Sequence, residues 1–158
     1  MNQPDNAHDV LNVVHAYFCA ADARDWETYR RLHADRVEVD FGGVNDDSDG
    51  SVTADDMLRS ARDLLDPVHL TQHMIGNEVV TIAGDEATVT FYEQALHHHP
   101  ALGEDPAVNT WILYARGEHR WQHTSDGWRI VAAKLVPVYS SGNATLLADV
   151  TKLTEANS

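Results

Sequence analysis

The sequence predicts an α+β domain in which a curled antiparallel sheet packs against helices. The main observation is the order of segments, which is two helices, a short strand, a third helix and then four long strands in consecutive hairpins. The second observation is the size of the chain, because 158 residues with 43% apolar content are enough to form one substantial hydrophobic core. We expect a single domain over residues 1–158, with its core at about 8–140 and a polar C-terminal tail.

Two helices are predicted at the start of the chain. Residues 8–24 carry apolar side chains at helical spacing along one line: Leu11, Val14 and Phe18. One more turn along this line arrives at Asp22, so a carboxylate stands where the pattern calls for an apolar residue. Asp25 is then typical of the N-cap of a second helix over residues 26–33.

A short strand and a third helix follow. Residues 37–41 alternate apolar with acidic side chains, which predicts a strand with one wet face. Residues 45–51 form an acidic loop, but its spacing does not match a calcium-binding EF-hand loop, and we predict no metal there. Thr53 with Asp56 resembles a capping box, and it opens a helix that Pro67 ends.

The second half of the chain predicts four strands in consecutive hairpins. The strands are rich in Val, Ile, Thr and aromatic residues, and they alternate with turn segments that contain Gly and Asp. Their expected ranges are 70–82, 87–99, 110–124 and 128–139. A sheet of this kind, curled around helices that close one side, forms a cone with an internal pocket, and such pockets are common ligand sites.

Charge and cysteine content exclude several kinds of protein. The 25 acidic against 11 basic residues give a net charge of -14, and no basic run is present to neutralise phosphates. We therefore expect neither nucleic acid nor a membrane as a partner. The single cysteine, Cys19, rules out an intrachain disulfide and a cysteine-built zinc site, and it fits a reducing cytoplasm. No nucleotide-binding or nucleophile-elbow motif is present, so we expect no cofactor.

His73 is the candidate chemical centre. It lies near the start of a predicted core strand, where a lone histidine is otherwise most often a half-buried structural residue. Asp22 is the anomaly that favours chemistry, because a carboxylate at an apolar helix position is costly unless it is paired. A paired carboxylate fixes the tautomer of an imidazole and raises the basicity of its other nitrogen. The pair therefore predicts a general base.

Four stretches together carry a family resemblance: Asp22 with Arg24-Asp25-Trp26, Val39-Asp40-Phe41, Thr71-Gln72-His73-Met74-Ile75-Gly76, and Asp126-Gly127-Trp128. They resemble the SnoaL-like branch of the nuclear transport factor 2-like (NTF2-like) superfamily, close in pattern to scytalone dehydratase and a bile acid dehydratase, over residues 8–140. The resemblance implies a cone-shaped α+β barrel. It also implies that His73 is the catalytic histidine, Asp22 its partner, and His98 or His99 a second active-site histidine.

The sequence departs from scytalone dehydratase in ways that argue against the same substrate. Ala21 and Phe41 stand where that enzyme has two tyrosines that bind water, and Arg116 and Glu118 replace a serine and an asparagine. The acid must therefore come from elsewhere, and its candidates are Glu118, Tyr17, Tyr92 and the histidines at 97–99. Tyr17 is equally typical of plain core. The expected substrate-binding residues are Tyr17, Phe41, Tyr92, Trp111 and Glu118.

The preferred function is a cofactor-independent lyase of dehydratase type, acting on a small apolar polycyclic or aromatic hydroxy-carbonyl compound. Two alternatives stay open: a polyketide cyclase or isomerase that uses the same base, and a non-catalytic binding protein like the small subunit of ring-hydroxylating dioxygenases. A metal centre would need the histidines at 97–99 with Glu93, or His119 with His123, but consecutive strand residues point to opposite faces. We expect no metal, a small-molecule substrate and a homo-oligomer, either a dimer or a trimer.

Overall fold

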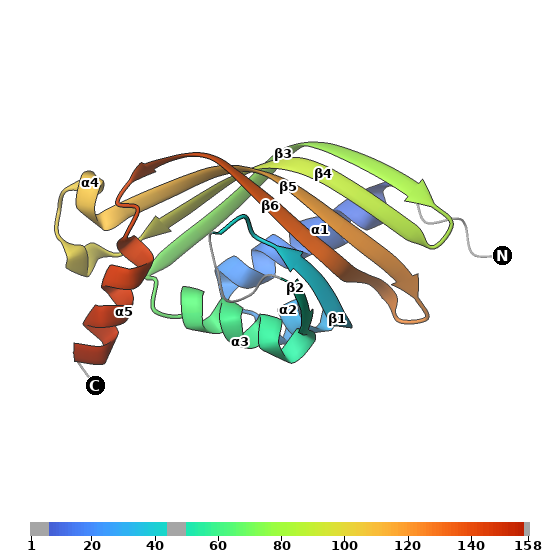
Figure 1. Cartoon of the computed structure of the whole chain (residues 1–158), viewed down its shortest axis with the longest axis horizontal. Coiled ribbons are helices and arrows are strands. Elements are labelled where there is room, and N and C mark those ends of the chain that lie inside the picture. Colours follow the sequence, from blue (N-terminus) through green and yellow to red (C-terminus); the bar gives the residue numbers. More distant parts are fainter. Residues whose placement is uncertain (1–6, 44–49, 157–158) are drawn as a thin grey trace.

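A curled six-stranded sheet arches over three helices, as the computed structural model shows (Figure 1). The structure describes residues 7–43 and 50–156. The strand order across the sheet is β2-β1-β6-β5-β4-β3. The strands are β1 (His33–Asp40), β2 (Gly50–Thr53), β3 (Leu70–Ala83), β4 (Glu86–His98), β5 (Thr110–Thr124) and β6 (Gly127–Gly142). The predicted α+β class with a curled sheet is confirmed, although β2 and β3 remain as free edges and the sheet does not close into a barrel.

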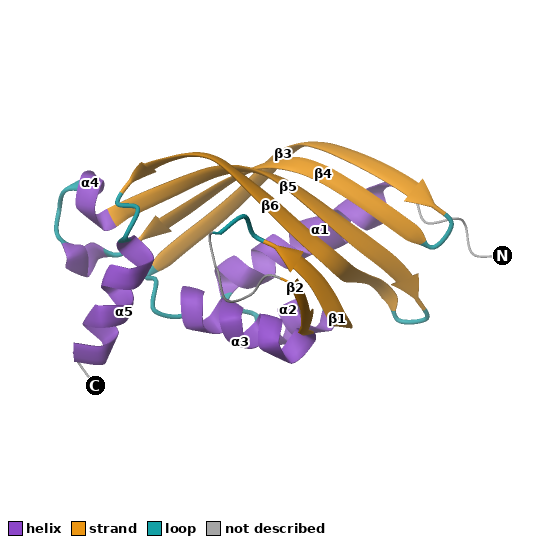
Figure 2. Cartoon of the chain, in the orientation of Figure 1, coloured by secondary structure: helices purple, strands orange, loops and turns teal. Residues whose placement is uncertain are grey.

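The helices lie under the concave side of the sheet and at one end of it (Figure 2). They are α1 (Ala7–Ala23), α2 (Trp26–Arg31), α3 (Ala54–Leu65), the 3₁₀ turn η1 (Pro100–Leu102), α4 (Pro106–Asn109) and α5 (Leu146–Ala156). The predicted caps are present, since Asp25 accepts a hydrogen bond from the Thr28 N–H and Thr53 accepts one from the Asp56 N–H. α1 packs along β3, which brings Asp22 near the start of that strand.

The four long strands form an antiparallel meander, as the turn signals predicted. β1 is the exception to the antiparallel pattern, because it runs parallel to β6. The β3–β4 register shifts between Gly76 and Val79, where Asn77 has a left-handed φ of 55°. His73 lies before this bulge, directly opposite Ala95.

Gly117 allows β5 to pass close to its neighbour. We expected an irregularity there, but the register shifts of the β5–β6 pair lie at Tyr114/Ala115 and Arg120/Trp121. The reason for a glycine is steric, because a Cβ at this position would lie 2.2 Å from the Phe91 ring.

Several segments differ from the sequence-based expectation. β1 begins at His33 rather than at 37, so the second helix is shorter than the predicted range 26–33. Residues 45–49 of the predicted loop lie outside the described residues. The last two loop residues, Gly50 and Ser51, instead begin β2, which pairs with β1. The expected polar tail is wrong from residue 146 onward, because residues 146–156 form α5. Leu146 and Val150 are one helical turn apart and buried, and they pack in a second apolar cluster with Val68, Ala95, Trp111, Leu113 and Ala115.

Candidate active site

A pocket lies between the inner face of the sheet and the helices, with about 140 Å³ of space for water-sized molecules. Its walls are mainly aromatic and aliphatic, and its few polar groups come from different elements. The polar and ionisable lining residues are Tyr17, Tyr29, Ser60, His73, Glu93, His97, His119 and Lys134. Leu147 of α5 also lines the pocket, so the C-terminal helix helps to enclose it.

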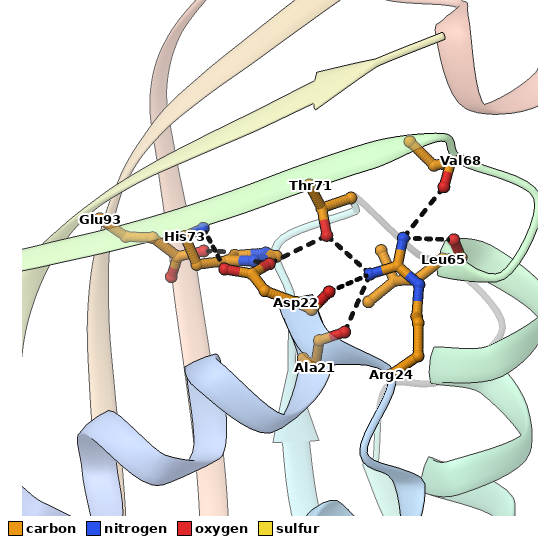
Figure 3. A network of polar contacts seen from close by, with 8 residues as sticks. All are labelled: Ala21, Asp22, Arg24, Leu65, Val68, Thr71, His73 and Glu93. Atoms are coloured by element: carbon orange, nitrogen blue, oxygen red, sulfur yellow. Dashed lines mark hydrogen bonds and ion pairs between the residues drawn. The ribbon is translucent and has the colours of Figure 1, made fainter.

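His73 lines this pocket, and Asp22, which does not line it, is tightly hydrogen-bonded to His73 (Figure 3). The His73 Nδ1–H donates to Asp22 Oδ1 over 2.7 Å, and the His73 backbone N–H donates to Asp22 Oδ2 over 2.7 Å. The Thr71 hydroxyl donates a third hydrogen bond, of 2.9 Å, to Asp22 Oδ1. Because Nδ1 is engaged by the carboxylate, Nε2 is the ring nitrogen left to act on a ligand.

Hydrogen bonding keeps Asp22 ionised. Burial alone would raise the pKa of Asp22, but the hydrogen bonds from His73 and Thr71 and the charge of His73 outweigh it, so the pKa lies below its ordinary value of 3.8. The carboxylate is therefore a permanent acceptor near neutral pH. It orients the imidazole and stabilises the imidazolium that forms when Nε2 takes a proton.

Arg24 holds the backbone around Asp22 in place (Figure 3). This residue has a left-handed φ of 58° in the turn between α1 and α2. Its guanidinium donates to the Thr71 hydroxyl over 2.7 Å and to the backbone carbonyls of Ala21, Asp22, Leu65 and Val68. The ends of α1 and α3 are thus tied to the start of β3 by one side chain, which fixes the distance between Asp22 and His73.

Glu93 is the second carboxyl group beside His73. It lies on β4, its residue exposure is 9%, and its Oε1 is 4.0 Å from His73 Nε2. Burial raises the pKa of Glu93; the charge of His73 lowers it and that of Asp22 raises it, with a net rise above 4.5. The two carboxyl groups near His73 therefore have opposite tendencies, ionised for Asp22 and protonated for Glu93.

The structure brings His97, and not His98 or His99, into the pocket. His97 is 4% exposed and its ring lies 5.9 Å from the His73 ring and stacks on Trp111 at 4.9 Å. Burial lowers the pKa of His97 to about 4, so it is a neutral imidazole. His98 Nδ1 instead lies 3.0 Å from the Thr110 hydroxyl, and His99 Nδ1 accepts a hydrogen bond from the Ala101 N–H at the start of η1. Neither lines the pocket, because strand alternation puts His98 on the face opposite to Glu93, Ala95 and His97, and His99 lies beyond the end of β4 as the N-cap of η1.

The other predicted binding residues divide between the two faces of the sheet. Tyr17, Phe41 and Trp111 line the pocket, as expected. Tyr92 is 55% exposed and Glu118 is also exposed, and both line a shallow depression on the outer face. The prediction that these two bind a ligand in the pocket is wrong, because each strand places them opposite to its buried residues.

An aromatic and histidine cluster forms part of the pocket wall and continues behind it to His33. The Tyr17 and Tyr29 hydroxyls lie 3.2 Å apart, and Tyr17 is packed against the rings of Phe18, His33 and His119. Burial lowers the pKa of His33 to about 4 and that of His119 to about 3, so both imidazoles are neutral. The two histidines of this cluster are therefore uncharged near neutral pH, and the Phe18 ring lies 5.8 Å from the ring of His73.

Sequence comparison identifies the family of this chain. The SnoaL-like domain matches residues 5–134. This chain belongs to the SnoaL-like family. Among curated protein sequences, none matches it. The crystal structure of the Kfla4162 protein from Kribbella flavida is 28% identical to this SnoaL-like protein, with a TM-score of 0.79 over 89% of this chain and 95% of that one.

Two further structures share the fold of this SnoaL-like protein at low identity. A candidate dehydratase of the NTF2-like family from Streptomyces avermitilis is 20% identical, with a TM-score of 0.71 over 84% of this chain and 96% of that one. A type 2 hexachlorocyclohexane dehydrochlorinase, LinA, is 14% identical, with a TM-score of 0.70 over 85% and 86%. These likenesses show a shared fold, and the proteins that share it include a hexachlorocyclohexane dehydrochlorinase and an NTF2-like superfamily protein from Salmonella enterica.

The expected catalytic and substrate-binding residues of this SnoaL-like protein did not include Tyr29, Glu93 or His119, and His97 was considered only as a candidate acid or metal ligand. The signal for Glu93 and His97 was present, because they continue the alternation set by the apolar residues Val89 and Phe91. In the described ranges 7–43 and 50–156, no group of three or more His, Cys, Asp or Glu side chains is arranged to hold a metal ion. In the same ranges, no helix is long and apolar enough to span a membrane.

Proposed function

We propose that this SnoaL-like protein is a cofactor-independent lyase of dehydratase type, in which His73 removes a proton next to a carbonyl group. The observation that carries the proposal is the pair of 2.7 Å hydrogen bonds that Asp22 accepts from the side chain and the backbone of His73 in a pocket wall. A purely structural cone has no need for a half-buried ionised carboxylate on a histidine.

The first chemical step follows from the tautomer of His73. Nδ1–H stays on the Asp22 carboxylate, and the lone pair of Nε2 takes a proton from the carbon α to the substrate carbonyl. The electrons of the C–H bond form the carbon–carbon double bond, and a hydroxyl on the β carbon leaves with the electrons of its own bond. The ionised Asp22 stabilises the imidazolium during this step without accepting the proton.

The lining of the pocket supports a small, largely apolar substrate. Phe18, Phe41, Met57, Leu64 and Trp111 contribute apolar walls, and Tyr17 and Tyr29 supply neutral hydroxyl groups. Such walls favour an aromatic or polycyclic hydroxy-carbonyl compound by hydrophobic contact and ring stacking. The low identity to LinA shows the fold alone, but a dehydrochlorinase also carries out an elimination, which is consistent with the proposed reaction class.

The test is a screen of hydroxylated steroids, naphthalenones and polyketide-like ketones, read by deuterium uptake at the α carbon and by formation of the conjugated product. His73→Gln keeps a donor towards Asp22, and Asp22→Asn keeps the size of the side chain. Each should cut the rate by on the order of 10²–10⁴-fold while the fold is kept, because proton transfer or its orientation is lost. His69→Gln, an exposed histidine near the start of β3, is the matched control.

Two results would overturn the proposal. Deuterium uptake at the wild-type rate in His73→Gln would make His73 a structural histidine. Tight binding of a screened ketone by the wild-type protein without any exchange or product would favour the non-catalytic binding function. If exchange occurs without loss of water, the same base serves an isomerase or a cyclase.

A further inference from the structure

We propose that Glu93 is the catalytic acid that protonates the departing hydroxyl group, and that it acts from the same face of the substrate as His73. This inference rests on the proposed function, because it completes the elimination that His73 begins. Its consequence is that the hydrogen and the hydroxyl leave from one face of the substrate, a syn elimination.

The β3–β4 register places the acid and the base together. His73 is paired with Ala95, and Glu93 and His97 lie two residues to either side of Ala95 on the same inner face. Diagonal neighbours of this kind are within reach of long side chains. Ala95 is 2% exposed and has only a methyl group, so the space in front of His73 is left to a ligand, with Glu93 at one side of it and His97 at the other.

Glu93 has no hydrogen-bond donor that would stabilise its ionised form within the described residues 7–43 and 50–156. The one ion-pair contact of Glu93 in these ranges is with His73 Nε2 at 4.0 Å, which is beyond hydrogen-bond length. A buried carboxylate without donors is costly, whereas a carboxylic acid at the same place costs much less. The rise of the Glu93 pKa through burial agrees with this geometry.

Apart from His73 and Lys134, the ionisable groups of the pocket wall around Glu93 are uncharged near neutral pH. Asp22 already balances any positive charge on His73, because it accepts both of the His73 hydrogen bonds. Tyr17, His97 and His119, which also line the pocket, are uncharged near neutral pH, because burial raises the pKa of Tyr17 and lowers those of the two histidines. Burial and the absence of donors thus favour the carboxylic acid form of Glu93 beside His73 Nε2.

The elimination then balances in atoms and charge. Nε2 of His73 takes the α proton, the C–H electrons form the double bond, the C–O bond breaks towards oxygen, and the Glu93 proton converts the leaving hydroxide into water. The site is left with an imidazolium and a carboxylate. Transfer of the proton from Nε2 to the Glu93 carboxylate restores both groups, and the short separation of the two atoms makes this return local.

The 4.0 Å separation of Nε2 and Oε1 also decides the stereochemistry. Each atom must come within roughly 3 Å of the substrate atom that it acts on. Acting from opposite faces would place the carbon skeleton between them and require a separation of roughly 6 Å. The observed distance suits two groups on the same face, so the removed hydrogen and hydroxyl are expected to be cis.

The experiment uses Glu93→Gln, which keeps the size of the side chain but has no acidic proton, with Glu118→Gln on the outer face as the matched control. The probes are 3-hydroxy-1-tetralone and its 3-acetoxy analogue, because acetate leaves as an anion and needs no proton. We expect Glu93→Gln to slow loss of water by on the order of 10²-fold or more, while loss of acetate and α-deuterium uptake stay within about 3-fold of the wild type. Glu118→Gln should resemble the wild type in all three assays.

A second measurement uses 3-hydroxy-1-tetralone carrying deuterium at the α carbon either cis or trans to the hydroxyl. The wild type should lose the label from the cis compound and keep it in the trans compound. Loss of the trans label, or equal slowing of water and acetate loss in Glu93→Gln, would overturn the role of Glu93. If the proposed function itself fails, the result is different, because the wild type then shows neither α-deuterium uptake nor loss of acetate.

Discussion

The stability of this protein should fall steeply in mild acid, because three buried histidines must stay neutral for the chain to fold. His33, His97 and His119 are each at most 4% exposed, and burial lowers their pKa values from 6.5 to about 4, about 4 and about 3. The unfolded chain therefore binds more protons than the folded one below pH 6.5. Stability from this source is complete above pH 6.5 and is lost as the pH falls towards the folded-state values.

The magnitude follows from these pKa values. Between pH 7.5 and pH 5.5 each histidine removes about 1.3 kcal/mol from the free energy of unfolding, so the three together remove about 4 kcal/mol. Most carboxyl groups titrate below this window. Glu93 is the exception and has the opposite sign, because its raised pKa means that the folded state gains stability as the pH falls. About 4 kcal/mol is therefore an upper value.

Urea unfolding at pH 7.5 and 5.5 measures the effect. His119→Phe should reduce the difference between the two free energies by about 1.3 kcal/mol, because it removes one of the three titrations and keeps a ring among Tyr17, Phe18 and Phe91. His69→Gln should leave the difference unchanged, because the His69 side chain is exposed in the folded state. Equal free energies at the two pH values in the wild type, or no change of the difference in His119→Phe, would refute the reasoning.

Three other substitutions test the framework of the site by urea unfolding. Arg24→Ala should cost about 2–4 kcal/mol of stability, because the carbonyls and the hydroxyl that the guanidinium binds lose charge-assisted hydrogen bonds. The stability of Arg24→Lys should lie between those of the wild type and Arg24→Ala. A loss below about 1 kcal/mol in Arg24→Ala would contradict the role of Arg24 in holding these segments together. Gly117→Ala should cost about 1–3 kcal/mol of stability, because its methyl group meets the Phe91 ring. Phe91→Leu should destabilise the Gly117→Ala variant less than it destabilises the wild type, because the smaller side chain relieves this contact. If the two losses of stability simply add, the contact between these positions is excluded. Leu146→Ala should cost about 2–5 kcal/mol of stability, because it leaves a cavity where a fully buried side chain was. No loss of stability would mean that α5 does not contribute to the fold.

The parts of the fold that the sequence predicted are those with strong local signals. α1 and α3 were indicated by helical spacing and capping residues, and the four long strands by β-branched segments between glycine turns. The pairing of Asp22 with His73 was predicted because a carboxylate interrupts an apolar helical line, which is a departure that needs a partner. Four-residue β2 has no periodicity to detect, and its pairing with β1 depends on tertiary structure.

The errors in the predicted site come from assigning residues to the wrong face of a strand. His98 was preferred to His97, and Glu118 to His119, because counting along a resemblance leaves an uncertainty of one residue, and one residue exchanges the two faces of a strand. The tail was judged by its polar composition, although Leu146 and Val150 already stood at helical spacing. Counting from a residue of known face, such as Phe91, would have resolved the β4 positions.

The alternation along β4 and β5 has a consequence for how such a protein changes over time. Each inward side chain, such as Glu93, Ala95 or His97, reaches the pocket from a backbone that is held by ladder hydrogen bonds independent of the side chain. A substitution at one of these positions exchanges a piece of the pocket wall and leaves the sheet as it was. The same cone is therefore free to acquire new substrates through single mutations on every second residue, which agrees with structural neighbours that keep TM-scores near 0.7 at 14–20% identity.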